Sequence, residues 1–247
     1  MRALLAFFTA FPVPAPGSSL GDAARSSHLL PLVGLLAGLP GAAILLLAYT
    51  LPPAVAATLA LAASLLAAGL HHTDGVIDVG DALMVRGSPA RRREVLKDAR
   101  VGAGAIGALF VVYAPPLAAL AALADVAPIE AAIAFVAAEV AARSAMLLML
   151  VFGRPADERS SSVLFVCSLK EGRRRTVALF LALSLPLLVA LPLGWGALVS
   201  LLAAPATVLF ALALARRAFG GISGDVAGAT GELTRAVLLV ALSGLLL

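Results

Sequence analysis

Charged residues are scarce in this chain of 247 residues: Asp, Glu, Lys and Arg together make up 13% of it. A soluble domain carries about twice that fraction. Aromatic residues are also few, at 5%, so the 62% of the chain that is hydrophobic is mainly aliphatic. Because a soluble fold of this length could not bury so much aliphatic surface, we exclude a soluble globular enzyme and predict an integral membrane protein.

Cysteine and histidine are almost absent, which restricts the kinds of metal site that can form. Cys167 is the only cysteine, so neither an intrachain disulfide nor a cysteine-based metal site is expected. His71 and His72 are adjacent, and His28 is the only other histidine, so we do not expect a zinc site. The net charge of +4 is modest, and we expect no nucleic-acid partner.

Long runs without any charged residue predict the membrane spans, at roughly 20 apolar residues each. The final apolar run, 236–247, is only 12 residues long and can span only if its helix begins near Ser223. We therefore predict an all-α fold, a polytopic transmembrane bundle of six to seven spans that forms a single domain over residues 1–247. The other expected spans are 29–51, 53–70, 101–124, 129–152 and two within 176–215, divided at 194–196.

The basic residues predict the orientation of the bundle. With this span order, the amino terminus and the polar segments 74–100, 153–175 and 216–235 share one face. Every Lys and Arg falls on that face except Arg143, which lies inside a span. The positive-inside rule then predicts a multi-pass protein of the cytoplasmic membrane whose active face is cytoplasmic.

An acidic run at the end of the second span is the strongest indication of chemistry. If that span continues as a helix, Asp74, Asp78 and Asp81 fall at i, i+4 and i+7, on one face. Carboxylates so close together repel one another unless a cation lies among them, and hard oxygen ligands suit Mg²⁺. A solvated acidic helix end is the alternative. His72 precedes the run and is either a substrate contact or a structural residue.

A basic stretch follows, from Arg86 to Arg100. Arg91–Arg93 are explained by topology and contact with anionic lipids. Lys97, Asp98 and Arg100 lead directly into Gly102, where the backbone can approach a ligand closely. Basic residues beside a carboxylate-held metal are what a pyrophosphate requires, so we expect Lys97 and Arg100 to be catalytic and Asp98 and Gly102 to bind substrate.

A third polar group lies near the carboxyl end. Gly220, Gly224 and Gly228 repeat every four residues, a spacing that permits close helix packing. Ser223 and Gly224 are expected to bind substrate, while Asp225 and Glu232, seven residues apart, are candidate metal ligands. Within the fourth span, Glu139 and Arg143 form an i, i+4 pair that is either structural or functional.

These segments together resemble the cobalamin synthase family, whose members are adenosylcobinamide-GDP ribazoletransferases. The resemblance covers nearly the whole chain, and the sequence departs from the expected pattern at Ala10, Ala82 and Ser223, none of which replaces a carboxylate. It is carried, in the family's order, by residues 7–14, 72–81, 96–102 and 220–225.

The resemblance implies a transfer of the cobinamide-phosphate group of adenosylcobinamide-GDP to alpha-ribazole or its phosphate. The products are adenosylcobalamin, or its phosphate, and GMP, and the family requires Mg²⁺. On this interpretation the three aspartates of the acidic run hold the metal, and Lys97 and Arg100 stabilise the leaving GMP. Asp225 or Glu232 either completes the metal shell or takes the proton from the attacking hydroxyl. The expected partners are these corrinoid and ribazole substrates and the lipid bilayer, and a homo-oligomer is possible.

Two other functions stay open at this point. A CDP-alcohol phosphotransferase also uses clustered aspartates with Mg²⁺, but its Asp-Gly-x-x-Ala-Arg pattern is missing, since Asp78 directly follows Ile77. A secondary transporter could use Glu139 and Arg143, but transporter sites lie near the bilayer midplane between repeats, and this chain shows no repeat.

Overall fold

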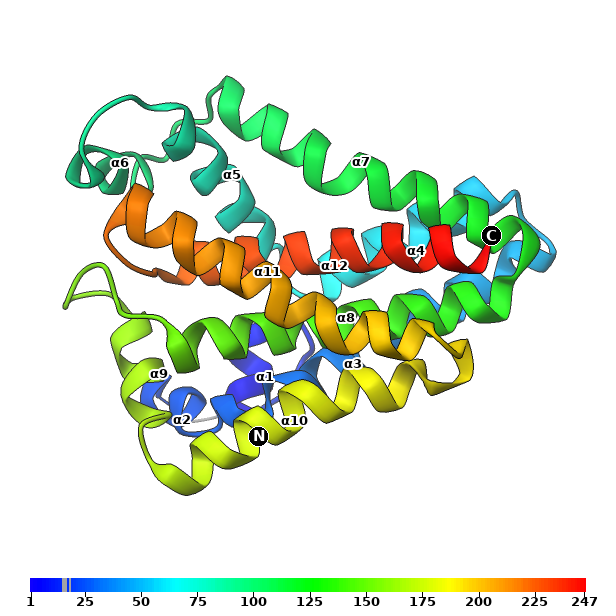
Figure 1. Ribbon diagram of the computed structural model, residues 1–247, viewed down its shortest axis with the longest axis horizontal. Coiled ribbons are helices and arrows are strands. Elements are labelled where there is room, and N and C mark those ends of the chain that lie inside the picture. Colours follow the sequence, from blue (N-terminus) through cyan, green and yellow to red (C-terminus); the bar gives the residue numbers. More distant parts are fainter. Residues whose placement is uncertain (15–16, 18) are drawn as a thin grey trace.

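Long helices that run side by side dominate the computed structural model, which describes residues 1–14, 17 and 19–247 (Figure 1). Six of them are long and apolar enough to cross a membrane, and a bent pair makes up to seven, as predicted from the sequence. Outside one isolated bridge between Pro155 and Ile222, the described part of the chain has no β-structure. The six are Ser27–Tyr49, which contains α3 (Leu30–Leu45), and the helices α7 (Ala103–Val126), α8 (Pro128–Phe152), α10 (Gly172–Ala190), α11 (Gly196–Phe219) and α12 (Gly224–Leu246).

The second predicted span is broken. Helix α4 (Pro53–Ala67) ends early, and α5 (His71–Met84) leaves it at an angle of 95°. The break occurs at Gly69 and Leu70, which adopt positive φ angles of 69° and 62°. At 1.5 Å per residue α4 is about 22 Å long, too short to cross a hydrocarbon core of about 30 Å. The acidic run therefore lies on a separate helix that starts inside the bundle.

The polar segments predicted as loops are partly helical. They contain α5, α6 (Pro89–Val95) and α9 (Ser162–Ser168), and α11 and α12 extend well into the last of them. Because α12 begins at Gly224, the final apolar run completes a span, as the sequence required. The same extension corrects one prediction: Arg235 lies inside α12 and is 1% exposed, so it does not belong to the basic face.

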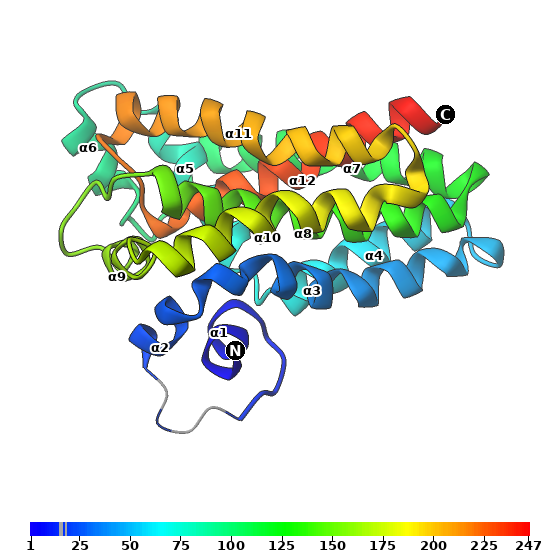
Figure 2. The ribbon, with the colours of Figure 1, turned by 60° about the horizontal axis from the view of Figure 1, so that its bottom comes forward.

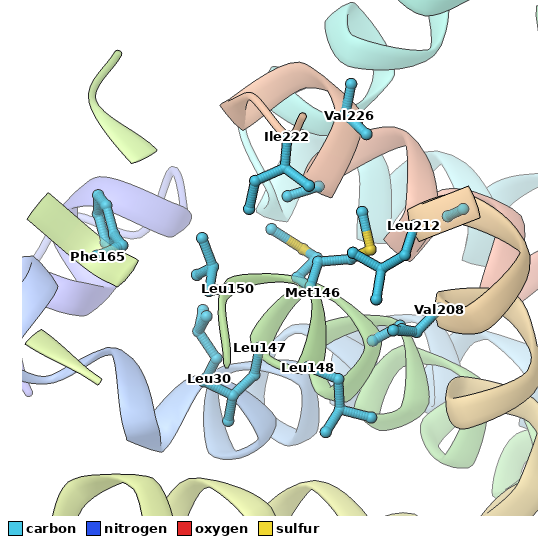
Figure 3. Close-up of a cluster of buried hydrophobic side chains, with 14 of the residues drawn as sticks. Leu30, Met146, Leu147, Leu148, Leu150, Phe165, Val208, Leu212, Ile222 and Val226 are labelled. Carbon is cyan, nitrogen blue, oxygen red and sulfur yellow. The ribbon is translucent and has the colours of Figure 1, made fainter. Parts of the chain in front are cut away.

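Helix α8 is the centre of the bundle, and nearly every residue from Ala131 to Leu150 is buried. It packs against α3, α10, α11 and α12. Gly34 of α3 permits a close approach, since a Cβ there would be 2.5 Å from the carbonyl oxygen of Glu139. Figure 3 shows the core at one end of α8, where its side chains meet those of α3, α11 and α12, among them Leu30, Met146, Leu147, Val208, Leu212 and Val226.

The amino-terminal segment lies beside the bundle rather than within it. Helices α1 (Arg2–Phe8) and α2 (Leu20–Arg25) lie next to α3, and Figure 2 shows α1 end-on while the long helices run across the view. Leu4 and Phe8 anchor α1, since both are buried. This position brings the end of α1 next to α9 and the start of α5.

Candidate active site

The crossing of α5 and α12 brings acidic residues from distant parts of the sequence together. Gly75 of α5 lies directly against α12, because a Cβ at this position would be 2.5 Å from the carbonyl oxygen of Asp225. Gly228 lies against His72 in the same way, because a Cβ at Gly228 would be 3.3 Å from the Cα of His72. Glycine at such positions lets two helix backbones approach closely. As a result Asp225 lies beside Asp74 and Asp78.

These three residues, which we call the acid cluster (Asp74, Asp78 and Asp225), are unpaired. Within residues 1–14, 17 and 19–247, no Lys, Arg or His nitrogen lies within 4.0 Å of their carboxylates. The carboxylates are close enough for their charges to repel one another. Asp225 gains some support from the Ser223 hydroxyl, which donates to its Oδ2 at 3.2 Å, and from its position in the first turn of α12.

Asp81, the third acid of the predicted run, has a different role. Its Oδ2 accepts a hydrogen bond from the backbone N–H of Gly102 at 2.6 Å, and its Oδ1 accepts one from Ala105 at 2.9 Å. Both carboxylate oxygens therefore hold the first turn of α7, whose backbone N–H groups have no partner within the helix. The structure makes Asp81 a cap of α7 and not a free ligand.

Two cavities meet where α12 begins, and both are lined by Gly224 and Asp225. We call the first the aromatic cavity, of about 430 Å³, and the second the basic cavity, of about 460 Å³. The aromatic cavity is lined mainly by Phe7, Phe8, His71, His72, Asp74, Met146, Leu150, Ser161, Ser162 and Phe165. The basic cavity is lined mainly by Arg93, Lys97, Asp157, Arg159, Ser160, Ser161, Gly221, Ile222 and Ser223.

The structure separates the predicted basic residues from one another. Lys97 lies at the basic cavity, where its Nζ is 3.3 Å from Asp157 Oδ2. Arg100 instead pairs with Asp98 at 2.7 Å, and its side chain is 89% exposed. The side-chain hydrogen bond from Arg100 lowers the pKa of Asp98 to about 2. Together with Gly102, these two residues line a third cavity between α5 and α7.

Glu232 lies neither in the acid cluster nor at these cavities. Its Oε2 forms an ion pair with Arg235 and accepts a hydrogen bond from the Tyr113 hydroxyl at 3.0 Å. Arg235 also forms an ion pair with Glu139, at 3.0 Å. This distance is shorter than the 3.6 Å between Glu139 and Arg143, the partner predicted from the sequence. We call these four ionisable residues, which are at most 1% exposed, the buried network (Glu139, Arg143, Glu232 and Arg235).

Several residues at the site and in the buried network had no role predicted from the sequence. Phe7 and Phe165 are more than 150 residues apart, and their rings come within 5.7 Å only because α1 folds back onto α9. Arg159 lies in a polar segment with no periodicity. Arg235 is seven residues after Gly228, and the glycine repeat could have extended the predicted helix to include it.

A metal ion would find oxygen ligands in the acid cluster but no complete cage. Among the described residues, no group of three or more His, Cys, Asp or Glu side chains is arranged to hold a metal ion. Mg²⁺, however, usually binds through one or two carboxylates, with substrate phosphates and waters completing the shell. Asp74 and Asp225 are unpaired and line the same cavity, so their chemistry fits such a partial site.

The chain is similar to known proteins over nearly its whole length. The model of the family described as cobalamin-5-phosphate synthase matches residues 1–243. Relatives named adenosylcobinamide-GDP ribazoletransferase include one from Azorhizobium caulinodans, 34% identical over 96% of this chain and 92% of the relative. Others are from Pyrobaculum islandicum, 36% identical over 97% and 92%, and Halorubrum lacusprofundi, 36% identical over 97% and 94%. No solved structure matches the chain. This chain is a member of the cobalamin-5-phosphate synthase family.

Proposed function

We propose that this protein is an adenosylcobinamide-GDP ribazoletransferase that acts with Mg²⁺ bound at the acid cluster. One observation carries the proposal: unpaired carboxylates lie where a cavity rich in aromatic residues meets a cavity rich in basic residues. A diphosphate donor brings negative charge, which the basic residues offset, and a bound cation would neutralise the carboxylates. The family's own relatives carry the same activity in their names.

In the proposed reaction, a ribose hydroxyl of alpha-ribazole or its phosphate forms a new bond to the phosphorus attached to cobinamide. The bond from that phosphorus to the oxygen bridging to GMP breaks, and GMP leaves with the electron pair. Asp225 lines both cavities, so a carboxylate oxygen of Asp225 that does not bind the metal would accept the hydroxyl proton. Lys97 and Arg159 of the basic cavity would stabilise the charge that develops on GMP. When bound, Mg²⁺ would supply further positive charge beside the diphosphate.

We further infer that the acid cluster opens toward the cytoplasm. The loops at the end of the bundle that carries α6 and α9 contain most of the basic residues, which the positive-inside rule places there (Figure 1). Cys167, on α9, is the only cysteine and is exposed. A membrane-impermeant maleimide should therefore label Cys167 in inside-out vesicles and not in sealed cells. Labelling in sealed cells would show that the protein has the opposite orientation.

The activity is tested with purified protein in liposomes. The protein is given adenosylcobinamide-GDP, alpha-ribazole and Mg²⁺, and GMP and the corrinoid product are followed together, with EDTA as the control. Release of GMP with formation of a cobalamin product, abolished by EDTA, supports both the transfer and its metal. Turnover that survives EDTA would remove the metal from the proposal, and no product from folded protein would refute the activity.

A further inference from the structure

The aromatic cavity and the basic cavity differ in the ligand that each can bind. The basic cavity has three cationic side chains, Arg93, Lys97 and Arg159, and two acids, Asp157 and Asp225, of which Asp225 is shared with the aromatic cavity. The aromatic cavity has no Lys or Arg in its lining, and its charged groups are the acids Asp74 and Asp225. A diphosphate is therefore favoured in the basic cavity, since of the two linings only this one carries cationic side chains, and a metal on Asp74 and Asp225 would contact the phosphates where the cavities meet.

Three phenylalanines form one wall of the aromatic cavity. The rings of Phe7 and Phe8 lie 4.9 Å apart at 76°, and those of Phe8 and Phe165 lie 5.8 Å apart at 80°, both edge-to-face. Phe8 and Phe165 are buried, whereas Phe7 is 43% exposed, so its ring has an uncovered surface. In Figure 3 Leu150 of α8 lies between Met146 and Phe165, and all three residues line this cavity.

His72 adds a polar group to this apolar wall. Its ring stacks on that of Phe8, with centroids 6.2 Å apart and an interplanar angle of 26°. The side chain is only 5% exposed, yet Nδ1 has no hydrogen-bond partner in the described part of the chain. A buried nitrogen without a partner costs free energy, and a ligand that supplies the missing group would recover it.

We propose that the aromatic cavity binds the planar nitrogenous base of the acceptor nucleoside, stacked on Phe7 and hydrogen-bonded to His72. This assignment rests on the proposed function and deepens it, because it leaves the basic cavity to the guanosine diphosphate part of the donor. The acceptor's ribose then points to Gly224 and Asp225, where the two cavities meet and where the proton acceptor lies. The volume of about 430 Å³ is within the range of small-molecule sites.

The proposal is tested by equilibrium binding, without turnover. Isothermal titration of purified protein in detergent measures the affinity of alpha-ribazole and, separately, of GDP. Phe7→Leu keeps an apolar side chain and removes the ring, so it should weaken the affinity for alpha-ribazole about tenfold and leave the affinity for GDP unchanged. Phe110→Leu is the matched control, since Phe110 lies on α7, is 72% exposed and lines neither cavity; it should change neither affinity.

The hydrogen bond to His72 is tested with two ligands of the same shape. The riboside of benzimidazole has a free ring nitrogen that the riboside of indole lacks. Wild-type protein should prefer the benzimidazole riboside, and His72→Leu should lose that preference while both ribosides still bind. Equal binding of both ribosides to the wild type would remove His72 from the proposal.

The outcomes separate this proposal from the proposed function. The cavity assignment is overturned if Phe7→Leu weakens the affinity for GDP and not that for alpha-ribazole. It is also overturned if the wild type binds both ligands and Phe7→Leu changes neither affinity. In both cases the transferase activity stands. If the wild type binds neither alpha-ribazole nor GDP, both proposals are refuted.

Discussion

Two clusters of ionisable side chains lie within this bundle, and they differ in whether their charges are paired. The buried network holds two acids and two bases, joined by ion pairs and closed to solvent. The acid cluster holds three carboxylates and has no basic partner among the described residues. The charges of the first cluster balance one another, although Arg143 donates no hydrogen bond within the described part of the chain, whereas the charges of the second have no such balance.

The position of each cluster along the helices explains the difference. Arg235 lies at the middle of α12 and Glu139 near the middle of α8, which places the buried network near the membrane midplane. An ionisable group at that depth is costly unless it is paired. Asp225 lies ten residues before Arg235, about 15 Å closer to the end of the bundle, beside open cavities. Water there can solvate unpaired acids.

The largest loss of turnover is expected when the acid cluster is changed. Asp78→Asn and Asp74→Asn remove one negative charge at nearly constant size, and each should lower turnover by at least about a hundredfold. Neither should lower the unfolding temperature, because each relieves repulsion instead of breaking a pair. Turnover assays and thermal unfolding of the same preparations check both parts. Normal turnover in Asp78→Asn would exclude its role at the metal.

The opposite result is expected in the buried network. Arg235→Met leaves Glu139 and Glu232 buried without their closest basic partner, and should destabilise the protein by about 3–5 kcal/mol. Denaturant unfolding in detergent measures this, and Arg217→Met, at the polar end of α11, is the control with a similar loss of charge. Equal stability of the two variants would show that the network is not structural.

The crossing that assembles the acid cluster should tolerate no side chain at Gly75. In Gly75→Ala the new Cβ meets the backbone of Asp225, so α5 and α12 must separate. We expect turnover to fall about tenfold and stability by about 1–3 kcal/mol. Gly107→Ala is the control, because a Cβ there meets nothing within 4 Å. Wild-type turnover in Gly75→Ala would mean that the close crossing does not position Asp225.

Removing the hydroxyl of Tyr113, which joins α5 to the buried network, should have the smallest effect on stability and turnover. The Tyr113 hydroxyl lies 3.0 Å from Thr73 Oγ1 and donates to Glu232, so it connects α5 to the buried network. Tyr113→Phe should lower stability by about 1 kcal/mol and change turnover only slightly. A loss of turnover as large as that of Asp78→Asn would instead place Tyr113 in the chemistry.

The sequence predicted the fold well because uncharged runs reflect the membrane directly. It placed six to seven spans, and the start of α12 near Ser223, within a residue or two. It did not predict the 95° break before α5, which occurs where Gly69 and Leu70 adopt positive φ angles. The break depends on how α5 packs against α7 and α12, which is a tertiary effect.

The candidate site was predicted in part. Periodicity placed Asp74, Asp78 and Asp81 on one helix, but it could not show that Asp81 caps α7. Glu232 shares a helix with Asp225, but it lies seven residues further along that helix and belongs to the buried network. Pairing between distant segments decides which acid stays free, and a single sequence does not contain that information.

The central claim is that the acid cluster is unpaired because it holds a metal, and metal-dependent unfolding tests it most directly. The unfolding midpoint is measured as Mg²⁺ is added, for the wild type, for Asp74→Asn/Asp225→Asn and for Asp157→Asn, a carboxylate at the basic cavity that already pairs with Lys97. A metal that binds only the folded protein raises the midpoint. We predict that Mg²⁺ raises it in the wild type and in Asp157→Asn but not in the double variant. An equal rise in the double variant, or no rise in the wild type, would contradict the account.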